Sequence, residues 1–401
     1  MTVRIKLLAS VAVVCALYTN SLQAQTFKTD PALLKTINKN FIDADAQYKV
    51  LASRLKPDRF PKTYYADKDS LETSASSWWC SGFYSGTALY LYQQTKDRAL
   101  LADANKSLGY LAKEQYNKGT HDLGFMMYCS FGNAMKAEPK EEYKQILVNS
   151  AKSLSTRFNP KIGVIKSWDS KKPEYLVIID NMMNLELLFW ATRATGDSSY
   201  YKIAVTHANT TMKNHFRPDY SSYHVVVYDP ETGAVKEKRT AQGFANESAW
   251  ARGQAWGLYG YTTLYRETKD KKYLEQANHI AKFILNNPSL PADKIPYWDF
   301  NAPNIPNALR DASAAAVMSS ALLELCKYTD AADAKIYFKV AETILKNLST
   351  PKYKAAAGTN GGFILKHSVG HFPNQTEIDV PLTYADYYFV EAMLRYKKFA
   401  R

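Results

Sequence analysis

Two aspartates stand where a purely structural role is hard to justify, and the first is Asp180. It lies in LVIIDNMMNLELLFWA, where Val, Ile and Ile precede it and Met and Leu residues follow it. A carboxyl among apolar side chains is partly desolvated, which favours the protonated form that a general acid needs. The structural alternative is an N-cap for the helix expected after it, and capping is compatible with catalysis.

The second acid, Asp122, follows a histidine in THDLGFMMY (120–128). Asp122 precedes an apolar stretch that is expected to be helical, so it can be a cap or a carboxylate facing a substrate. The residues alone leave both readings open. His121 by itself is more typical of a hydrogen-bonded structural histidine than of a catalyst.

The densest group of unusual residues is AQGFANESAWARGQAWGLYG (241–260). A helix beginning near Ser248 would place Arg252 and Trp256 on one face at four-residue spacing. Arg252 could then pair bidentately with a carboxylate, while Trp250 and Trp256 could stack on the apolar faces of sugars. In the alternative reading, both tryptophans belong to the core and Arg252 is a surface charge.

Two further aspartates lie in similar settings, one between aromatic residues and one before a predicted helix, but they indicate a function less clearly. Asp299 lies between aromatic residues in YWDFNAP (297–303), and its role stays open. Asp311 precedes Ala-Ser-Ala and is interpreted only as the start of a helix. The chain contains no nucleophile elbow, zinc-protease motif, phosphate loop or dinucleotide fingerprint, so no metal or nucleotide cofactor is indicated.

Composition indicates the kind of ligand that these residues would meet. The formal charge is +13, and 13% of the residues are aromatic. Lysines are spread along the chain without a nucleic-acid motif, which favours a soluble polyanion over DNA or RNA. The aromatic content suits a sugar-binding cleft as well as a dense core.

The first 24 residues read as a secretory signal peptide. Arg4 and Lys6 precede the apolar run LLASVAVVCALY, and Ala24 ends a small-residue cleavage site. We expect an exported, periplasmic or secreted protein without stable membrane insertion, and lipid attachment through Cys15 is disfavoured. The remaining cysteines, Cys80, Cys129 and Cys326, form neither a disulfide framework nor a metal site.

A repeated pattern in the sequence indicates where in the fold the candidate residues lie. An apolar helix closes on a short polar turn such as TKD or TGD, and a second helix follows. Five such hairpins are expected, at 88–112, 126–154, 185–216, 256–285 and 321–348, and segments around 31–54 and 381–398 would form a sixth. Both terminal segments are amphipathic, so we predict ring closure: an all-α (α/α)6 toroid that forms one domain over residues 25–401, as a monomer.

This arrangement separates two ends of the ring. The TKD-type turns are short, whereas the connections at the other end are long and carry all the unusual residues, so function is expected there. One long connection contains HVVVYDPETGAV (224–235), which predicts a small β-hairpin with its turn at DPETG.

Taken together, THDLGF, IIDNMMNLELLFWA, SSYHVV, QGFANESAWARGQAWGLYG and IDVPLTYADYYFVEAM resemble glycoside hydrolase family 88, the unsaturated glucuronyl hydrolases of bacterial glycosaminoglycan breakdown. The resemblance runs from about Trp78 to the C-terminus. It implies hydration of the C4–C5 double bond of an unsaturated uronate, without a cofactor, on chondroitin, hyaluronan or heparin oligosaccharides.

The resemblance also implies residue roles. Asp180 would be the general acid and then base, and Asp122 an essential partner. The implied substrate contacts are His121, His224, Gln242, Arg252 and Trp256, with Trp79, Trp168 and Trp250 lining the pocket. We therefore expect Asp122 both to start its helix and to present a carboxylate.

The loop KHSVGHFPNQTEID (366–379) resembles the family less closely, and Lys366 and Ser368 are predicted there as contacts for a sulfate. Two rival functions remain at this point. One is an unsaturated galacturonyl hydrolase that acts on pectin fragments. The other is a helical repeat protein that binds oligosaccharides without turnover, which would have little reason to bury Asp180.

Overall fold

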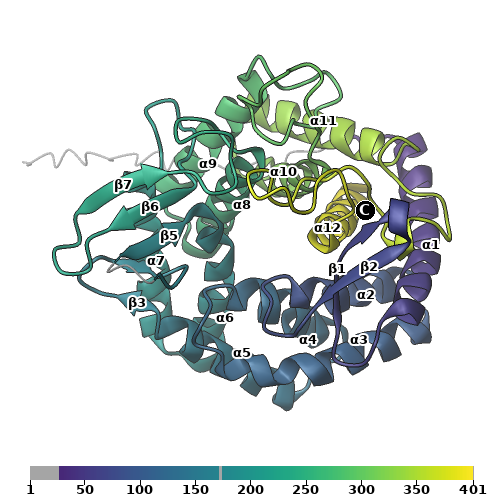
Figure 1. Ribbon diagram of the computed structural model, residues 1–401, viewed down its shortest axis with the longest axis horizontal. Helices are drawn as coiled ribbons and strands as arrows, with labels where there is room; N and C mark the ends of the chain where they lie inside the picture. Colours follow the sequence, from purple (N-terminus) through teal and green to yellow (C-terminus); the bar gives the residue numbers. More distant parts are fainter. Residues whose placement is uncertain (1–26, 171–173, 401) are drawn as a thin grey trace, which may run out of the picture.

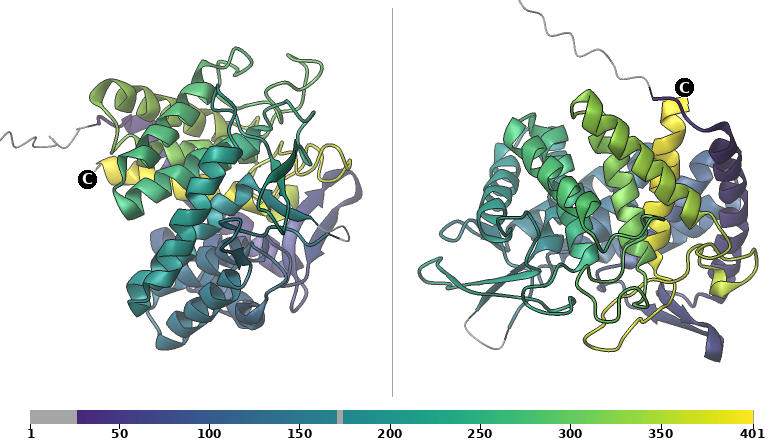
Figure 2. Two further views of the ribbon diagram at one scale, coloured as in Figure 1. Left: turned by 90° about the vertical axis from the view of Figure 1, so that its left-hand side faces the viewer. Right: turned by 90° about the horizontal axis from the view of Figure 1, so that it is seen from above.

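The computed structural model describes residues 27–170 and 174–400, which form a closed ring of helices (Figure 1). The predicted signal peptide, with Cys15 and Ala24, lies outside the described residues. Strands and long loops gather at one end of the ring, and the C-terminus lies at the other (Figure 2). No helix in the described part of the chain combines the length and apolarity needed to cross a membrane.

Four of the predicted hairpins are confirmed with their turns. They are α2 (Ser81–Thr95) with α3 (Arg98–Leu111), α6 (Leu185–Thr195) with α7 (Ser198–Asn214), α8 (Ala251–Thr268) with α9 (Lys271–Asn286), and α10 (Ala312–Leu325) with α11 (Ala331–Leu348). Each second helix begins at an aspartate whose side chain accepts a backbone N–H of the first turn: Asp97, Asp197, Asp270 and Asp330. Local turn chemistry thus fixes the short end of the ring.

The fifth hairpin is less regular. Its first arm is a π-helix, η3 (Gly124–Gly132), continued by α4 (Asn133–Ala137), and its second arm is α5 (Glu141–Ser155). The ends of the chain supply the sixth pair, α1 (Pro31–Arg54) and α12 (Thr383–Lys397), and α12 packs between α10 and α2. The predicted (α/α)6 toroid is therefore confirmed, and α12 closes it.

The inner helices are buried nearly all round. Every residue of α10, ASAAAVMSSALLEL, is buried, and its small side chains let α8 and α12 approach on both sides. Such a helix has no polar face to orient it, so its sequence indicates the inner ring but not the direction of each side chain.

The strands form three small sheets. The predicted hairpin is confirmed as β6 (Val225–Tyr228) and β7 (Val235–Arg239), and β5 (Tyr175–Ile178) adds to β6 as an unpredicted third strand. A second hairpin, which was not predicted, consists of β1 (Phe60–Tyr65) and β2 (Ser70–Ser74) and lies at the same end of the ring. The third sheet is the pair of β3 (Phe158–Asn159) and β4 (Val164–Ile165). Short 3-10 segments complete the described elements: η1 (Ala66–Lys68), η2 (Ala112–Tyr116), η4 (Ile179–Asn184), η5 (Asn360–Gly362) and η6 (Lys398–Ala400).

The cysteines agree with the prediction of no disulfide framework. Cys80 and Cys326 are buried, Cys129 is partly buried, and all three are free thiols. In the described part of the chain the helical ring is thus held by packing and by polar contacts between helices, without a disulfide.

Candidate active site

A cavity of about 450 Å³ opens at the end of the ring that carries the strands and long loops. Its wall includes both candidate acids together with cationic and aromatic side chains. The lining residues are Lys62, Tyr65, Glu72, Trp78, Trp79, His121, Asp122, Phe125, Trp168, Ile178, Asp180, Gln242, Arg252, Gly370, His371, Asn374, Thr376, Glu377 and Tyr384.

Pairing of β5 with β6 places Asp180. Ile178 lies opposite Val225, and the next residue along, Ile179, donates its N–H to the carbonyl of His224 at 3.0 Å. The chain then turns into η4, which carries Asp180 into the cavity wall with only 8% of its surface exposed. Asp180 makes no capping bond, and α6 begins later with Asn184 at its N-cap, so the capping alternative is wrong.

His224 lies behind Asp180 and fixes its orientation. The Nε2 of His224 is 3.3 Å from Oδ1 of Asp180. On the other side of the ring, Nδ1 accepts the backbone N–H groups of Ala241 and Gln242 at 3.2 and 3.4 Å. Because Nδ1 acts as an acceptor, the neutral ring carries its proton on Nε2, the nitrogen nearer the carboxylate, although the two groups form no hydrogen bond.

Asp122 precedes η3 and is held by polar neighbours. Its carboxylate accepts from the hydroxyl of Thr120 at 3.2 Å and from Nδ2 of Asn184 at 3.4 Å. Burial, and more weakly the negative charge of Asp180, raises the pKa of the Asp122 carboxyl against the opposing effect of His121. The two acids therefore share one electrostatic environment.

A close approach of η3 and η4 brings the acids together. A side chain at Gly124 would meet the Cα of Asn184 at 2.4 Å, so only glycine fits there. The Oδ1 of Asn184 in turn accepts the N–H of Phe125 at 2.9 Å. The π-helix begins at this contact, in keeping with the frequent occurrence of such turns at functional sites.

The expected capping role of Asp122 is only half right. Its backbone carbonyl accepts the N–H of Met126 at 2.8 Å, but its side chain makes no cap and points to the cavity. His121 is 1% exposed, with Nε2 3.4 Å from Oδ1 of Asp122, and it also lines the cavity.

Arg252 is buried and ties a loop to the cavity wall. Its Nη1 lies 2.8 Å from Oδ2 of Asp311 and donates to the carbonyl of Val369, while Nη2 donates to the carbonyl of Gly370, both at 2.6 Å. Asp311 also caps α10 by accepting the N–H of Ser313 at 3.0 Å. The prediction that Asp311 only starts a helix missed this ion pair, and the surface-charge reading of Arg252 is wrong.

Three other predicted contacts lie in the cavity wall. Gln242 donates to the carbonyl of Gly370 at 3.1 Å, next to the Arg252 anchor. Trp79 packs against Tyr384 with ring centroids 4.8 Å apart, and Trp168 meets His224 edge-on at 5.8 Å. Both indoles face the cavity beside the acids.

Two tryptophans predicted at the pocket lie behind it. Trp256 is fully buried between Phe125 and Tyr388, at centroid distances of 5.1 and 5.4 Å. Trp250 is 3% exposed, and its ring centroid lies 4.6 Å from that of the His224 imidazole. It therefore supports the position of His224 beside Asp180. The helix begins at Ala251 instead of near Ser248, so Trp250 is its N-cap, while Arg252 and Trp256 keep their four-residue spacing.

The predicted sulfate contacts also lie outside the cavity wall. The ammonium of Lys366 donates to the carbonyl of Pro351 at 2.7 Å, and Ser368 is fully buried in a bridge with Val380. The same loop does reach the cavity, but through Gly370, His371, Asn374, Thr376 and Glu377. Asp299, the ambiguous acid, accepts from Phe244 N and Ser248 Oγ at 2.9 and 2.7 Å and has a structural role.

Sequence reasoning missed the β1–β2 hairpin as part of the site. It contributes Lys62, whose Nζ lies 2.5 Å from Glu72 and 3.7 Å from Glu377, and 5.1 Å from the exposed ring of Trp78. The alternation of Lys, Thr and Tyr in FPKTYY was the available signal. No cluster able to hold a metal ion occurs in the part of the chain that the structure describes.

The cavity thus combines the neighbouring carboxylates of Asp122 and Asp180, the cation of Arg252, a Lys62 paired with Glu72 and Glu377, and aromatic walls, which suits an anionic sugar and proton transfer. Comparisons with known proteins agree with this chemistry. Residues 53–262 match the model of Glycosyl Hydrolase Family 88. The chain is 44% identical over 365 residues to an unsaturated glucuronyl hydrolase of Formosa agariphila, covering 90% of each protein.

Two further similarities concern the substrate. A solved structure described as an unsaturated glucuronyl hydrolase specific for heparin is 49% identical, with a TM-score of 0.88, covering 91% of this chain and 98% of that one. An unsaturated chondroitin disaccharide hydrolase of Streptococcus pneumoniae is 33% identical over 329 residues, covering 80% of this chain and 82% of that protein.

Proposed function

The chain belongs to glycoside hydrolase family 88, and from that membership we propose how its cavity works. The protein is a glycosidase that hydrolyses unsaturated glucuronyl residues from glycosaminoglycan oligosaccharides. The sugar to be removed is the non-reducing uronate, which carries a C4–C5 double bond. In this proposal Asp180 and Asp122 carry out the chemistry on that bond.

Asp180 is the general acid and then the base. Its carboxyl proton goes to C4, the double bond is lost, and water adds to C5 while the carboxylate takes up the water's proton. The resulting hemiketal opens to a ketone at C5, which leaves a hemiacetal at C1. Collapse of that hemiacetal releases the next sugar, so one water is consumed and the anomeric carbon is never attacked.

The single observation that carries this assignment is the geometry of Asp180. Its carboxylate is almost fully buried at the cavity wall, and Oδ1 lies 3.3 Å from Nε2 of His224. Neither of these two atoms has a hydrogen-bond partner within the described residues, so the carboxylate keeps its oxygens available for the substrate. His224 itself does not line the cavity, so its role is to position Asp180.

Asp122 and Arg252 assist from opposite sides. Asp122 places a second carboxyl beside Asp180, and burial raises its pKa; its oxygens are suited to hydrogen bonding with the hydroxyls of the uronate. Arg252 supplies positive potential for the uronate carboxylate while it anchors Val369 and Gly370. Lys62 adds a second cation at the mouth of the cavity.

Heparin-type disaccharides are the proposed preferred substrates. The support is the 49% identity to an enzyme described as specific for heparin, against 33% to a chondroitin disaccharide hydrolase. The protein is further proposed to act as an exported monomer, because residues 1–24 have the pattern of a signal peptide and the closed ring buries its own core. A mature N-terminus at Gln25 in cell extracts would test the export.

The test uses lyase-made disaccharides of heparin, chondroitin and hyaluronan, with pectin-derived unsaturated galacturonides as a comparison. The conjugated double bond absorbs in the near ultraviolet, so the protein should abolish this absorbance, fastest with heparin disaccharides. In D2O the released uronate should carry deuterium at C4. Persistent absorbance with every substrate would leave a non-catalytic binder, and loss only with galacturonides would favour the pectin enzyme.

A further inference from the structure

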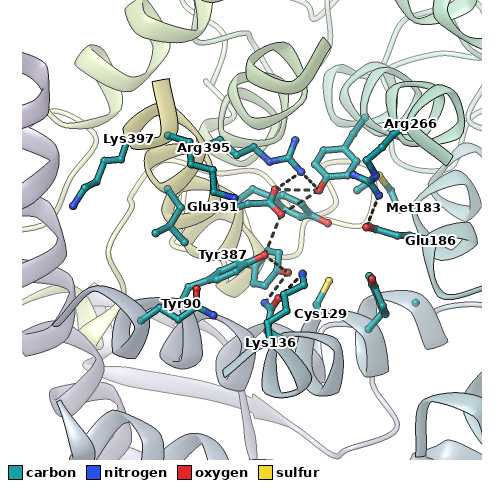
Figure 3. Close-up of a pocket in the computed structure, with 18 of the residues that line it drawn as sticks. Tyr90, Cys129, Lys136, Met183, Glu186, Arg266, Tyr387, Glu391, Arg395 and Lys397 are labelled. Atoms are coloured by element: carbon teal, nitrogen blue, oxygen red, sulfur yellow. Dashed lines mark hydrogen bonds and ion pairs between the residues drawn. The ribbon is translucent and has the colours of Figure 1, made fainter. Parts of the chain in front are cut away.

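A second cavity, drawn in Figure 3, is lined by the C-terminal part of α12, at the end of the ring opposite the strands (Figure 2). Its volume is about 410 Å³. The helices that line the substrate cavity line this one as well, further along their length: α12 contributes Tyr384 to the first and Arg395 to the second. We call it the rear cavity.

A layer of packed side chains separates the two cavities. Phe125 contacts Trp256 at 5.1 Å, and Trp256 contacts Tyr388 at 5.4 Å. Phe125 lines the substrate cavity, Tyr388 lines the rear cavity, and Trp256 lines neither. A ligand in the rear cavity would therefore occupy a separate site.

The carboxylates of the rear cavity are already satisfied. Glu391 accepts from the hydroxyls of Tyr259 and Ser320, at 3.1 and 2.5 Å. Arg266 pairs with Glu186 at 2.5 Å and with Glu324 at 2.9 Å, while Arg395 reaches Glu324 at 2.6 Å. Glu324 is shared by both arginines, and their charges outweigh its burial and lower its pKa to about 2.

Two lysines of the rear cavity have no such partner. Within residues 27–170 and 174–400, neither Lys136 nor Lys398 forms an ion pair with a carboxylate. The ammonium of Lys136 donates to the side-chain oxygen of Asn133 at 3.2 Å and lies 5.7 Å from the centroid of the Tyr128 ring. Both lysine side chains are exposed. Desolvation, then the charges of Arg395 and Lys136, lower the pKa of Lys398 against the effect of Glu391.

We propose that the rear cavity is a binding site for a sulfate-type oxyanion, held by Lys136 and Lys398 beside Arg395. The three cations come from α4, η6 and α12, and all of them line the rear cavity. A tetrahedral anion with several acceptor oxygens can pair with both lysines, while Arg395, whose nitrogens already contact Glu324 and Glu391, adds positive potential. The tyrosines of the wall, Tyr90, Tyr128, Tyr387 and Tyr388, leave room for a sugar that carries the sulfate.

A structural role for these lysines would give a different result. Lys136 lies in the last turn of α4, and a cation there stabilises the carbonyl end of a helix without any ligand. In that case substitution would lower stability slightly and leave anion binding unchanged. Binding and its charge dependence therefore distinguish the two roles.

The experiment is calorimetric titration of the whole protein, at constant ionic strength set with NaCl, with sodium sulfate in one arm and glucosamine N-sulfate in the other. We expect the Lys136→Ala/Lys398→Ala double variant to weaken binding by at least about tenfold, and the corresponding double Arg variant to restore it. Tight binding of both titrants indicates a site for the free oxyanion, and tight binding of glucosamine N-sulfate alone indicates a sulfated sugar. Both results support the site.

The matched control removes two exposed lysines of the outer helices, Lys106→Ala/Lys152→Ala, and should bind as the wild type does. Lys62→Ala, in the substrate cavity, should also keep the rear-cavity binding. Full disaccharide turnover by the rear-cavity variant in sulfate-free buffer shows that it is folded. Equal binding by the wild type and the rear-cavity variant, or loss of binding in Lys62→Ala, would overturn the proposal.

Discussion

Nε2 of His224 lies 3.3 Å from Oδ1 of Asp180, and the opposite ring nitrogen accepts two backbone N–H groups. The neutral imidazole thus carries its proton on the nitrogen that lies nearer the carboxylate. Replacing His224 by Gln should lower kcat about 100-fold while changing KM little, since the residue positions the acid but does not touch substrate. Steady-state kinetics with a heparin disaccharide tests this.

His279→Gln is the matched control, because His279 stacks on Tyr220 at 3.9 Å, away from the cavity. It should leave kcat unchanged. A rise in KM with constant kcat in His224→Gln would instead assign His224 to direct substrate binding.

Arg252→Lys should weaken substrate binding although the charge is kept. A lysine ammonium cannot reproduce the two-nitrogen contact with Asp311, Val369 and Gly370, so the loop beyond Gly370 loses its anchor. We expect KM to rise about tenfold with a smaller fall in kcat. Unchanged KM would show that the loop is held by other contacts.

Substitution of Trp256 should mainly lower the stability of the protein, whereas substitution of Trp79 should mainly weaken substrate binding. Trp256→Phe leaves a void in the layer between the two cavities, and should lower the free energy of unfolding by about 1 to 3 kcal/mol with near-normal turnover by the folded enzyme. Trp79→Ala, at the cavity wall, should raise KM about tenfold and affect stability less. Urea denaturation and kinetics on both variants test the pair, and the reverse pattern would restore Trp256 to the site.

These tryptophans illustrate what the sequence could and could not predict. The helical hairpins were predictable because their turns are local: a short polar sequence ends one helix and an aspartate caps the next. The direction of Trp256 was not, because α8 is buried nearly all round and only Arg252 of the predicted pair lines the cavity. A helix without a polar face gives no periodicity from which to orient its side chains.

The strands show the same limit for contacts that are distant in the chain. The pairing of β5 with β6 sets Asp180 beside His224, but four apolar residues between loops do not reveal a strand or its partner. The bridge between Ser368 and Val380 likewise turns Ser368 inward, against its predicted role. Residue types therefore indicated the two acids and Arg252, but not Lys62, while long-range pairing decided which residues face the cavity.

Asp122 should make stability depend on pH. Its pKa is raised in the folded protein, so the native state binds more protons than the unfolded chain in the window above about 3.9. Its contribution to stability is complete below that value and is lost as pH rises through the folded pKa. Asp122→Asn does not ionise, so its free energy of unfolding relative to the wild type should increase with pH, by on the order of 1 kcal/mol.

Thermal and urea unfolding from pH 4 to 7 measures this difference. Asp58→Asn, an exposed acid with a salt bridge to Lys113 at 3.0 Å, provides the control and should show almost no such trend. A difference that shrinks as pH rises would mean that Asp122 is ionised and stabilising in the fold.

The most direct test of the central claim follows the near-ultraviolet absorbance of a heparin disaccharide with wild-type protein and with Asp180→Asn. The account predicts complete loss of the absorbance with the wild type, and a rate at least about 1000-fold lower with Asp180→Asn although the disaccharide still binds. Loss of absorbance at the wild-type rate in Asp180→Asn would contradict it, because another group would then protonate the double bond.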